Sequence, residues 1–154
     1  MTQTPEGLDD LYQDIILDHF RSPRHQGALA HANLHGEGFN PFCGDQVDLT
    51  MALGDDGRIT DVGFEGQGCS ISQASASMLT VQLMGKSLDE AEALVQTFKG
   101  IMKGDELSEA LEDELGEIAS LQGVRQFPIR IKCALLGWTT LQDAIAEFRK
   151  TAAS

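Results

Sequence analysis

Apolar residues recur along this chain with two different periods, and the change of period separates predicted helices from predicted strands. Between residues 8 and 21 they follow the three–four spacing of a helix with one buried face. Positions 47–53 and 60–64 instead alternate apolar and polar residues, which is typical of half-buried strands. A Gly-Asp-Asp-Gly turn at residues 54–57 joins them and predicts an antiparallel hairpin, with residues 33–39 as an edge strand. The predicted buried faces comprise Leu8, Leu11, Tyr12, Ile15, Ile16, His19 and Phe20 in the helix, and Val47, Leu49, Met51, Leu53, Thr60, Val62 and Phe64 in the strands.

Helical spacing returns after the hairpin. Ser70 followed by Gln73 has the form of a capping box, so a helix is predicted to begin at about residue 70. Ser87 and Glu90 repeat the pattern and predict a second helix that ends near Gly100. The buried face predicted for the first of these two helices comprises Ile71, Ala74, Met78 and Val81.

The segment from residue 104 to residue 123 is strongly acidic. Its apolar residues keep helical spacing, so we predict a short acidic helix with a solvated face rather than disorder. Pro128 then suits the first turn of a last helix, whose long apolar stripe we expect to be interrupted near Gly137. The length suits a single domain over residues 1–154, in which we expect residues 1–7 to be flexible.

Charge and hydropathy narrow the functional classes. The formal charge of −13 argues against nucleic acid as a partner, because phosphate binding needs clustered Lys and Arg. It favours encounter with a basic surface on another protein. No apolar run approaches the length of about 18 residues that spans a membrane, and the amino terminus lacks the basic start and apolar stretch of a secretory signal. We therefore expect a cytoplasmic protein.

The candidate chemistry lies in three cysteines and one aspartate. Cys43 and Asp45 stand two residues apart across a glycine, so in an extended segment both side chains point to the same side. Pairing of the hairpin strands would bring them next to Cys69, at the start of a predicted helix where unpaired N–H groups favour a thiolate. Cys133 falls in the first turns of the last helix, flanked by cations that also favour a thiolate. Three cysteines without an export signal favour one metal site over a disulfide framework, with unrelated buried or surface thiols as the alternative.

Zinc takes three thiolates and one carboxylate in a tetrahedral arrangement, and the thiolates also suit an iron–sulfur cluster. With zinc the set would carry a net charge of about −2. The cations expected to compensate that charge are Arg125, Arg130 and Lys132. His31 and His35 flank the edge strand and could in principle bind metal. They are weaker candidates, because the cysteine–aspartate set already fills a tetrahedral site. His19 lies on the apolar stripe of the first helix and is expected at the edge of the core.

Four segments of the chain carry a resemblance to a known family. In order they are LYQDIILDH at residues 11–19, NPFCGD at 40–45, GCSISQASAS at 68–77 and FPIRIKCA at 127–134. Together they resemble the U-type iron–sulfur cluster assembly proteins, the family of the NifU amino-terminal and IscU-like domains, and the likeness runs from about residue 8 to residue 149. The resemblance implies an α+β fold, a small three-stranded antiparallel sheet with helices packed on one face. It also implies metal ligands at Cys43, Asp45, Cys69 and Cys133.

Two features resemble the SufU-type branch of this family. Scaffold members carry a histidine immediately before the last cysteine, where this chain has Lys132, and they lack an acidic insertion such as residues 104–123. SufU-type members bind zinc and accept sulfur from a SufS-type cysteine desulfurase, a pyridoxal-phosphate enzyme. The resemblance therefore implies a zinc-dependent sulfurtransferase of iron–sulfur cluster biogenesis. Cys43 would accept the persulfide sulfur, and the other three residues would keep the metal.

Two other functions stay open at this point. The chain would be a scaffold if an iron–sulfur cluster forms on the same four residues before its delivery to apoproteins. It would be a structural zinc domain if the metal only shapes a surface that docks to a partner, although structural sites usually take ligand pairs from short loops. The metal content and colour of the purified protein separate a zinc protein from a cluster scaffold.

Overall fold

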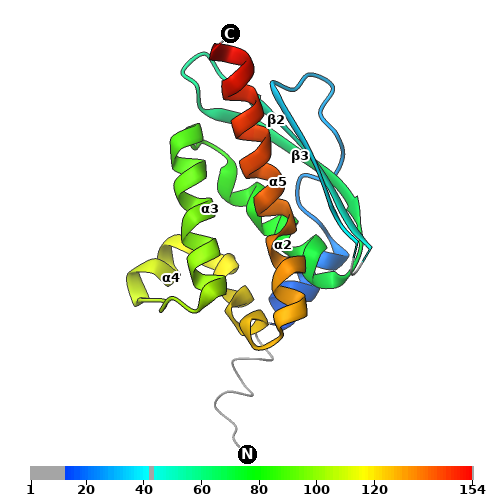
Figure 1. Ribbon diagram of the computed structural model, residues 1–154, viewed down its shortest axis with the longest axis vertical. Coiled ribbons are helices and arrows are strands. Elements are labelled where there is room, and N and C mark those ends of the chain that lie inside the picture. The colour runs from blue at the N-terminus through cyan, green and yellow to red at the C-terminus, as the bar shows by residue number, and fades with distance from the viewer. Residues whose placement is uncertain (1–12, 42–43, 154) are drawn as a thin grey trace, which may run out of the picture.

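Three antiparallel strands form one sheet, and two helices, α2 (Ser70–Leu83) and α5 (Pro128–Ala153), pack against it (Figure 1). The computed structural model describes residues 13–41 and 44–153. In chain order its elements are β1 (Leu34–Asn40), β2 (Asp45–Leu53), β3 (Ile59–Gln67), α2 (Ser70–Leu83), α3 (Leu88–Lys103), α4 (Glu109–Leu115), the 3-10 segment η1 (Gly116–Gln126) and α5 (Pro128–Ala153). A helix over residues 13–21 precedes the sheet. The expected α+β fold is confirmed.

The strand order β1-β2-β3 confirms the predicted hairpin and edge strand. Val47, Leu49 and Met51 of β2 are buried as predicted, but Thr50 is buried as well and Leu53 is only half-buried. In β3, Thr60 is exposed and the adjacent Ile59 is buried. The register between β2 and β3 shifts between Ala52 and Leu53, and this irregularity moves the inward positions at the start of β3 by one residue. The prediction for Thr60 is therefore wrong because a bulge cannot be seen in an alternating pattern.

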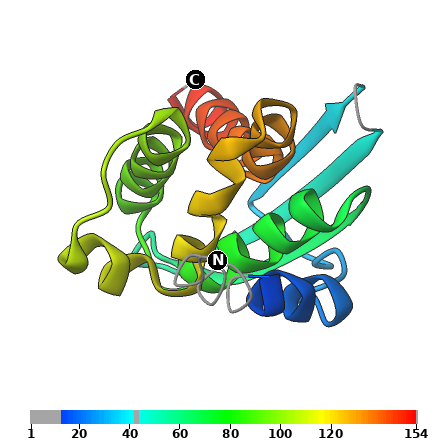
Figure 2. The ribbon, with the colours of Figure 1, turned by 90° about the horizontal axis from the view of Figure 1, so that it is seen from below.

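α5 lies between the sheet and α3, as two perpendicular views show (Figures 1 and 2). Glycine at two inward positions of β1 allows the close approach of this helix. A Cβ atom at Gly36 would lie 2.9 Å from the Thr140 carbonyl oxygen, and one at Gly38 would overlap the Thr140 hydroxyl. Any larger residue at either position would push α5, and Cys133 with it, away from the sheet.

Trp138 joins three helices in the core. Its fully buried ring stacks on Phe98 of α3, with ring centroids 4.1 Å apart. Its indole N–H donates to Ser75 Oγ of α2 at 2.9 Å, and that hydroxyl donates to the Ala134 carbonyl oxygen at 2.6 Å. Ala134 follows Cys133 directly, so these bonds set the position of α5 relative to α2 next to the candidate site.

The first helix departs from its predicted buried face at Phe20, and its predicted residues 8–12 lie outside the described part of the chain. His19, predicted on that face at the edge of the core, is only 1% exposed. Its ring nitrogens contact Ser77 Oγ and a Glu117 carboxylate oxygen, each at 2.7 Å, and these partners make burial of the ring possible. Phe20, predicted to be buried, is 40% exposed.

α2 begins where the sequence predicts, but for a different reason. Its N-cap is Cys69, which makes no side-chain capping hydrogen bond, so the predicted Ser70–Gln73 capping box is wrong. The helix is buried on almost every side from residue 72 to residue 80, and the predicted inward residue Val81 is exposed. A helix covered all round carries little amphipathic pattern from which its inward face can be predicted.

The later helices confirm one predicted capping box and differ from the prediction in where they end or continue. The capping box of Ser87 and Glu90 is present at the start of α3, but this helix continues past Gly100 to Lys103. The acidic segment forms α4 and then η1 instead of one helix. α5 runs through Gly137 without the expected interruption, and this glycine packs closely against Ala76 of α2. No helix within the described residues is long and apolar enough to cross a membrane.

Candidate metal centre

Asp45 stands at the first position of β2 and is fully buried. Its partner across the sheet is Asn40, the last residue of β1. Between these two residues the chain turns, and the Gly44 N–H donates to the Asn40 carbonyl oxygen at 2.8 Å. Cys43, two residues before Asp45 in the sequence, lies outside the described residues. Strand pairing thus holds the Asp45 carboxylate at the start of β2.

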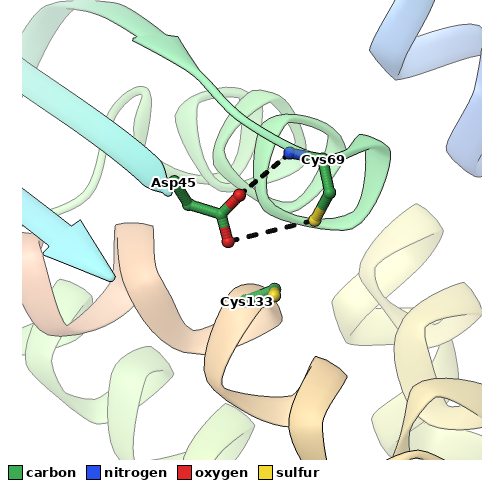
Figure 3. A group of neighbouring side chains, drawn as sticks. All are labelled: Asp45, Cys69 and Cys133. Carbon is green, nitrogen blue, oxygen red and sulfur yellow. Dashed lines mark hydrogen bonds between the residues drawn. The ribbon is translucent and has the colours of Figure 1, made fainter. Parts of the chain in front are cut away.

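Cys69 reaches the same place from the other end of the hairpin. Its backbone N–H donates to Asp45 Oδ1 at 2.9 Å, and its thiol contacts Asp45 Oδ2 at 3.9 Å (Figure 3). Gly68 makes this contact possible, because a Cβ atom there would overlap Asp45 Oδ1 and lie 2.9 Å from its Cα. The aspartate therefore accepts the backbone N–H of Cys69, the N-cap residue of α2, and faces its thiol at the same time.

Cys133 comes from the first turns of α5 and is fully buried. Its sulfur lies near Asp45 and Cys69 (Figure 3). The thiol donates to the Ile129 carbonyl oxygen at 3.9 Å within the helix, and the side-chain amide of Asn40 donates to its sulfur at 3.9 Å. Three elements distant in sequence thus bring one carboxylate and two thiols together.

The geometry of this group fits a zinc ion. The ligand atoms of Asp45, Cys69 and Cys133 all lie within 4.8 Å of one another. In a tetrahedral site, Zn–S bonds of about 2.3 Å and Zn–O bonds of about 2.1 Å place neighbouring ligand atoms about 3.6–3.8 Å apart. The contact of 3.9 Å between Asp45 Oδ2 and Cys69 Sγ is close to that separation. Three donors of this kind leave one tetrahedral position for a fourth ligand.

Among the described residues, no histidine joins a second group of metal-ligand side chains of this size. His31 is exposed, and His35 pairs with Glu37 at 3.7 Å. Arg125, expected to compensate the charge of the site, donates to the carbonyl oxygens of Ile101 and Asp105. These bonds connect η1 to the end of α3, and the charge compensation stays a prediction.

Sequence reasoning missed two residues of this centre. Asn40 and Gly68 stand beside the ligands and shape their surroundings, yet neither carries a group that binds metal. A signal for Asn40 was available, since it opens the stretch that contains Cys43 and Asp45. For Gly68 the signal is its position directly before Cys69, where a residue without a side chain leaves room for a neighbouring ligand.

The surface around the centre combines apolar and basic side chains. Phe39, Phe127 and Ile129 are respectively 64%, 59% and 70% exposed, which is unusual for side chains of this size. Arg130 and Lys132 are exposed on the first turns of α5. A pocket of about 510 Å³ opens nearby, and its lining includes Ser70, Ile71, Phe127 and Arg130. Such a mixture suits contact with another protein.

Comparison with known proteins now gives the family. The chain matches the NifU-like N terminal domain over residues 11–154. It is 44% identical over 140 residues to the zinc-dependent sulfurtransferase SufU of Bacillus subtilis, with 91% of this chain and 92% of the relative covered. It is 42% identical over 138 residues to the iron–sulfur cluster assembly scaffold protein IscU of Streptococcus pyogenes, with coverage of 90% and 84%.

A solved structure agrees. The FiSufU protein of Fervidobacterium islandicum superposes with a TM-score of 0.78 at 37% identity, and 86% of this chain and 94% of that one are covered. The fold, the sequence identity and the grouping of Asp45, Cys69 and Cys133 all indicate the same family. The chain therefore belongs to the family of NifU-like N-terminal domains.

Proposed function

We propose that this protein is a zinc-binding sulfur acceptor of iron–sulfur cluster assembly. It would take persulfide sulfur from a SufS-type cysteine desulfurase through Cys43. Asp45, Cys69 and Cys133 would hold the zinc ion together with Cys43. The observation that carries the proposal is the meeting of one carboxylate and two thiols, whose ligand atoms all lie within 4.8 Å of one another.

Two further observations support transfer over a scaffold role. The relative with 44% identity is named a zinc-dependent sulfurtransferase. Lys132, rather than histidine, precedes Cys133, and histidine at that position accompanies the scaffold function in similar proteins. The identity of 42% to an IscU scaffold keeps cluster assembly as the competing function, and the test below must separate the two.

The transfer itself is an exchange between sulfur atoms. The Cys43 thiolate attacks the outer sulfur of the desulfurase persulfide, a new S–S bond forms on Cys43, and the old S–S bond breaks. The desulfurase cysteine leaves as a thiolate, so no external oxidant or reductant is needed. Bound zinc would supply a Lewis acid that keeps its cysteine ligands deprotonated until they react.

The described residues divide into two groups that support these roles. Asp45 and Cys133 are fully buried, which suits lasting ligands that do not meet the partner. Pro41 and Gly44, on either side of the segment that contains Cys43, are exposed, which suits a thiol that must reach a persulfide on another protein. The apolar and basic surface described above gives the desulfurase a place to dock beside this turn.

Sulfide release from L-cysteine by a SufS-type desulfurase tests the proposal. Addition of the zinc-loaded protein should stimulate turnover, while the metal-stripped protein and Cys43→Ala should not. A persulfide on Cys43, detected by mass spectrometry as one added sulfur, should accumulate when no acceptor is present. Unchanged stimulation by Cys43→Ala would refute the transfer role.

Metal content separates transfer from cluster assembly. Purified protein should be colourless and hold about one zinc ion. Anaerobic reconstitution with iron and sulfide is the comparison, because a stable brown cluster that passes to an apoprotein would favour the scaffold function instead. Stimulation of the desulfurase without any transfer of sulfur would leave only a docking role.

A further inference from the structure

Asn40 connects the segments that carry the candidate ligands, although it carries no metal-ligand atom itself. Its side chain is buried, with 6% exposure, and its amide donates to Cys133 Sγ across the interface between β1 and α5 at 3.9 Å. Its backbone pairs with Asp45 in the sheet, and its carbonyl oxygen accepts the Gly44 N–H at 2.8 Å. One residue therefore contacts β2, the turn before it and α5.

We propose that Asn40 is a positioning residue of the metal centre, whose side-chain amide orients the Cys133 sulfur and compensates part of its charge. The proposal rests on the zinc site of the proposed function. Cys133 is fully buried, so water cannot solvate its sulfur as a thiolate. An N–H donor aimed at the sulfur offsets this loss, and hydrogen bonds of this kind tune metal–thiolate sites.

The Cys69 and Cys133 thiols differ in the groups that face their sulfur atoms. The Cys69 thiol faces the Asp45 carboxylate, which is itself a candidate ligand. The Cys133 sulfur accepts a hydrogen bond from a neutral amide that is not a ligand. This asymmetry favours Cys133 as a lasting ligand, because the amide stabilises its thiolate inside the protein. Asn40 would thereby help to keep the metal in place while another thiol exchanges.

A merely structural role of Asn40 makes different predictions. Its backbone bonds to Gly44 and within the sheet persist in any side-chain variant, so a substitution isolates the amide. Asn40→Leu keeps the approximate size and removes the donor without adding charge. Asn40→Asp keeps the shape, removes the N–H groups and adds a negative charge. Gln46→Glu is the matched control for Asn40→Asp. Gln46 is exposed on the neighbouring strand, and its substitution changes an amide to a carboxylate and adds the same charge.

Zinc affinity of the isolated protein, measured by competition with a chromophoric chelator, tests the proposal without the desulfurase. We expect Asn40→Leu to weaken zinc binding by about 10- to 100-fold, the usual effect of removing a group that supports a ligand. Asn40→Asp should weaken it at least as much, and Gln46→Glu should match the wild type. In the cobalt-substituted protein, the sulfur-to-metal charge-transfer band should shift in both Asn40 variants and stay unchanged in Gln46→Glu.

Thermal unfolding gives the second readout. The midpoint should fall more for zinc-loaded than for metal-free Asn40→Leu. An equal fall in both forms, with zinc affinity and the cobalt spectrum unchanged, would overturn the proposal and leave a structural role. If Asn40→Leu does not fold, Asn40→Asp decides by the same criteria. Wild-type protein that fails to bind zinc would overturn the proposed function as well, whereas normal wild-type binding with unaffected Asn40 variants would overturn this inference alone.

Discussion

Gly68→Ala is the substitution that most directly probes how the fold holds the candidate site. Gly68 has a φ of +144°, a conformation that L-residues rarely adopt. The added methyl group would overlap Asp45 Oδ1 and lie 2.9 Å from Asp45 Cα. Neither the strand that carries Asp45 nor the start of α2 can move freely, so the carboxylate must shift and lose its hydrogen bond from the Cys69 N–H.

The expected cost has two parts. An unfavourable backbone conformation costs about 1–3 kcal/mol. Loss of the charge-assisted hydrogen bond between Cys69 and Asp45 costs about 1.5–3 kcal/mol more. Together they destabilise the protein by about 2.5–6 kcal/mol, which lowers the unfolding midpoint by about 5–24 °C for a chain of this size. Displacement of Asp45 should also weaken zinc binding, since one of the donors leaves its place.

Gly27→Ala is the matched control, because it separates the backbone strain from the clash. Gly27 has a φ of +107°, and an added Cβ atom meets no atom of the described residues within 4 Å. We expect backbone strain alone to destabilise Gly27→Ala, by about 1–3 kcal/mol. The variant should bind zinc like the wild type. Thermal unfolding with and without zinc, together with chelator competition, measures both effects. Equal destabilisation by the two variants, with equal zinc affinity, would refute the account of Gly68 as a space-making residue.

Three other predictions concern the helices that support the site. Ser87→Ala removes the α3 cap and should reduce the free energy of unfolding by about 1 kcal/mol in urea titrations. The Ser87 N–H and then Arg58 lower the pKa of Glu90, so its stabilisation exists above the ordinary pKa and is lost as pH falls through the lowered one. In Glu90→Gln, the free energy of unfolding should therefore fall less as the pH is lowered. A free energy of unfolding with the same pH dependence as the wild type would contradict this prediction. Trp138→Phe deletes the donor to Ser75 and should lower stability by about 1–3 kcal/mol in the same titrations.

Elements with a local signal could be predicted well from the sequence. The alternation in β2 and the turn after it predict the hairpin, because strand faces repeat every two residues. The capping box at Ser87 is confirmed, since all its hydrogen bonds form within one turn. The α2 N-terminus was placed correctly with the wrong cap. The cap there is Cys69, and the Asp45 carboxylate that accepts its N–H is far away in sequence.

The sequence by itself determined the residue types of the site and the secondary structure on which they stand. Asp45, Cys69 and Cys133 were chosen from their chemistry and from likeness to a family, and a hairpin predicted that the first two would meet. Only the tertiary structure decided that Cys133 reaches them and that Asn40 faces its sulfur. The physical reason is that the position of α5 depends on contacts between distant residues, such as Gly38 with Thr140 and Trp138 with Ser75, and such contacts leave no periodic pattern along the chain.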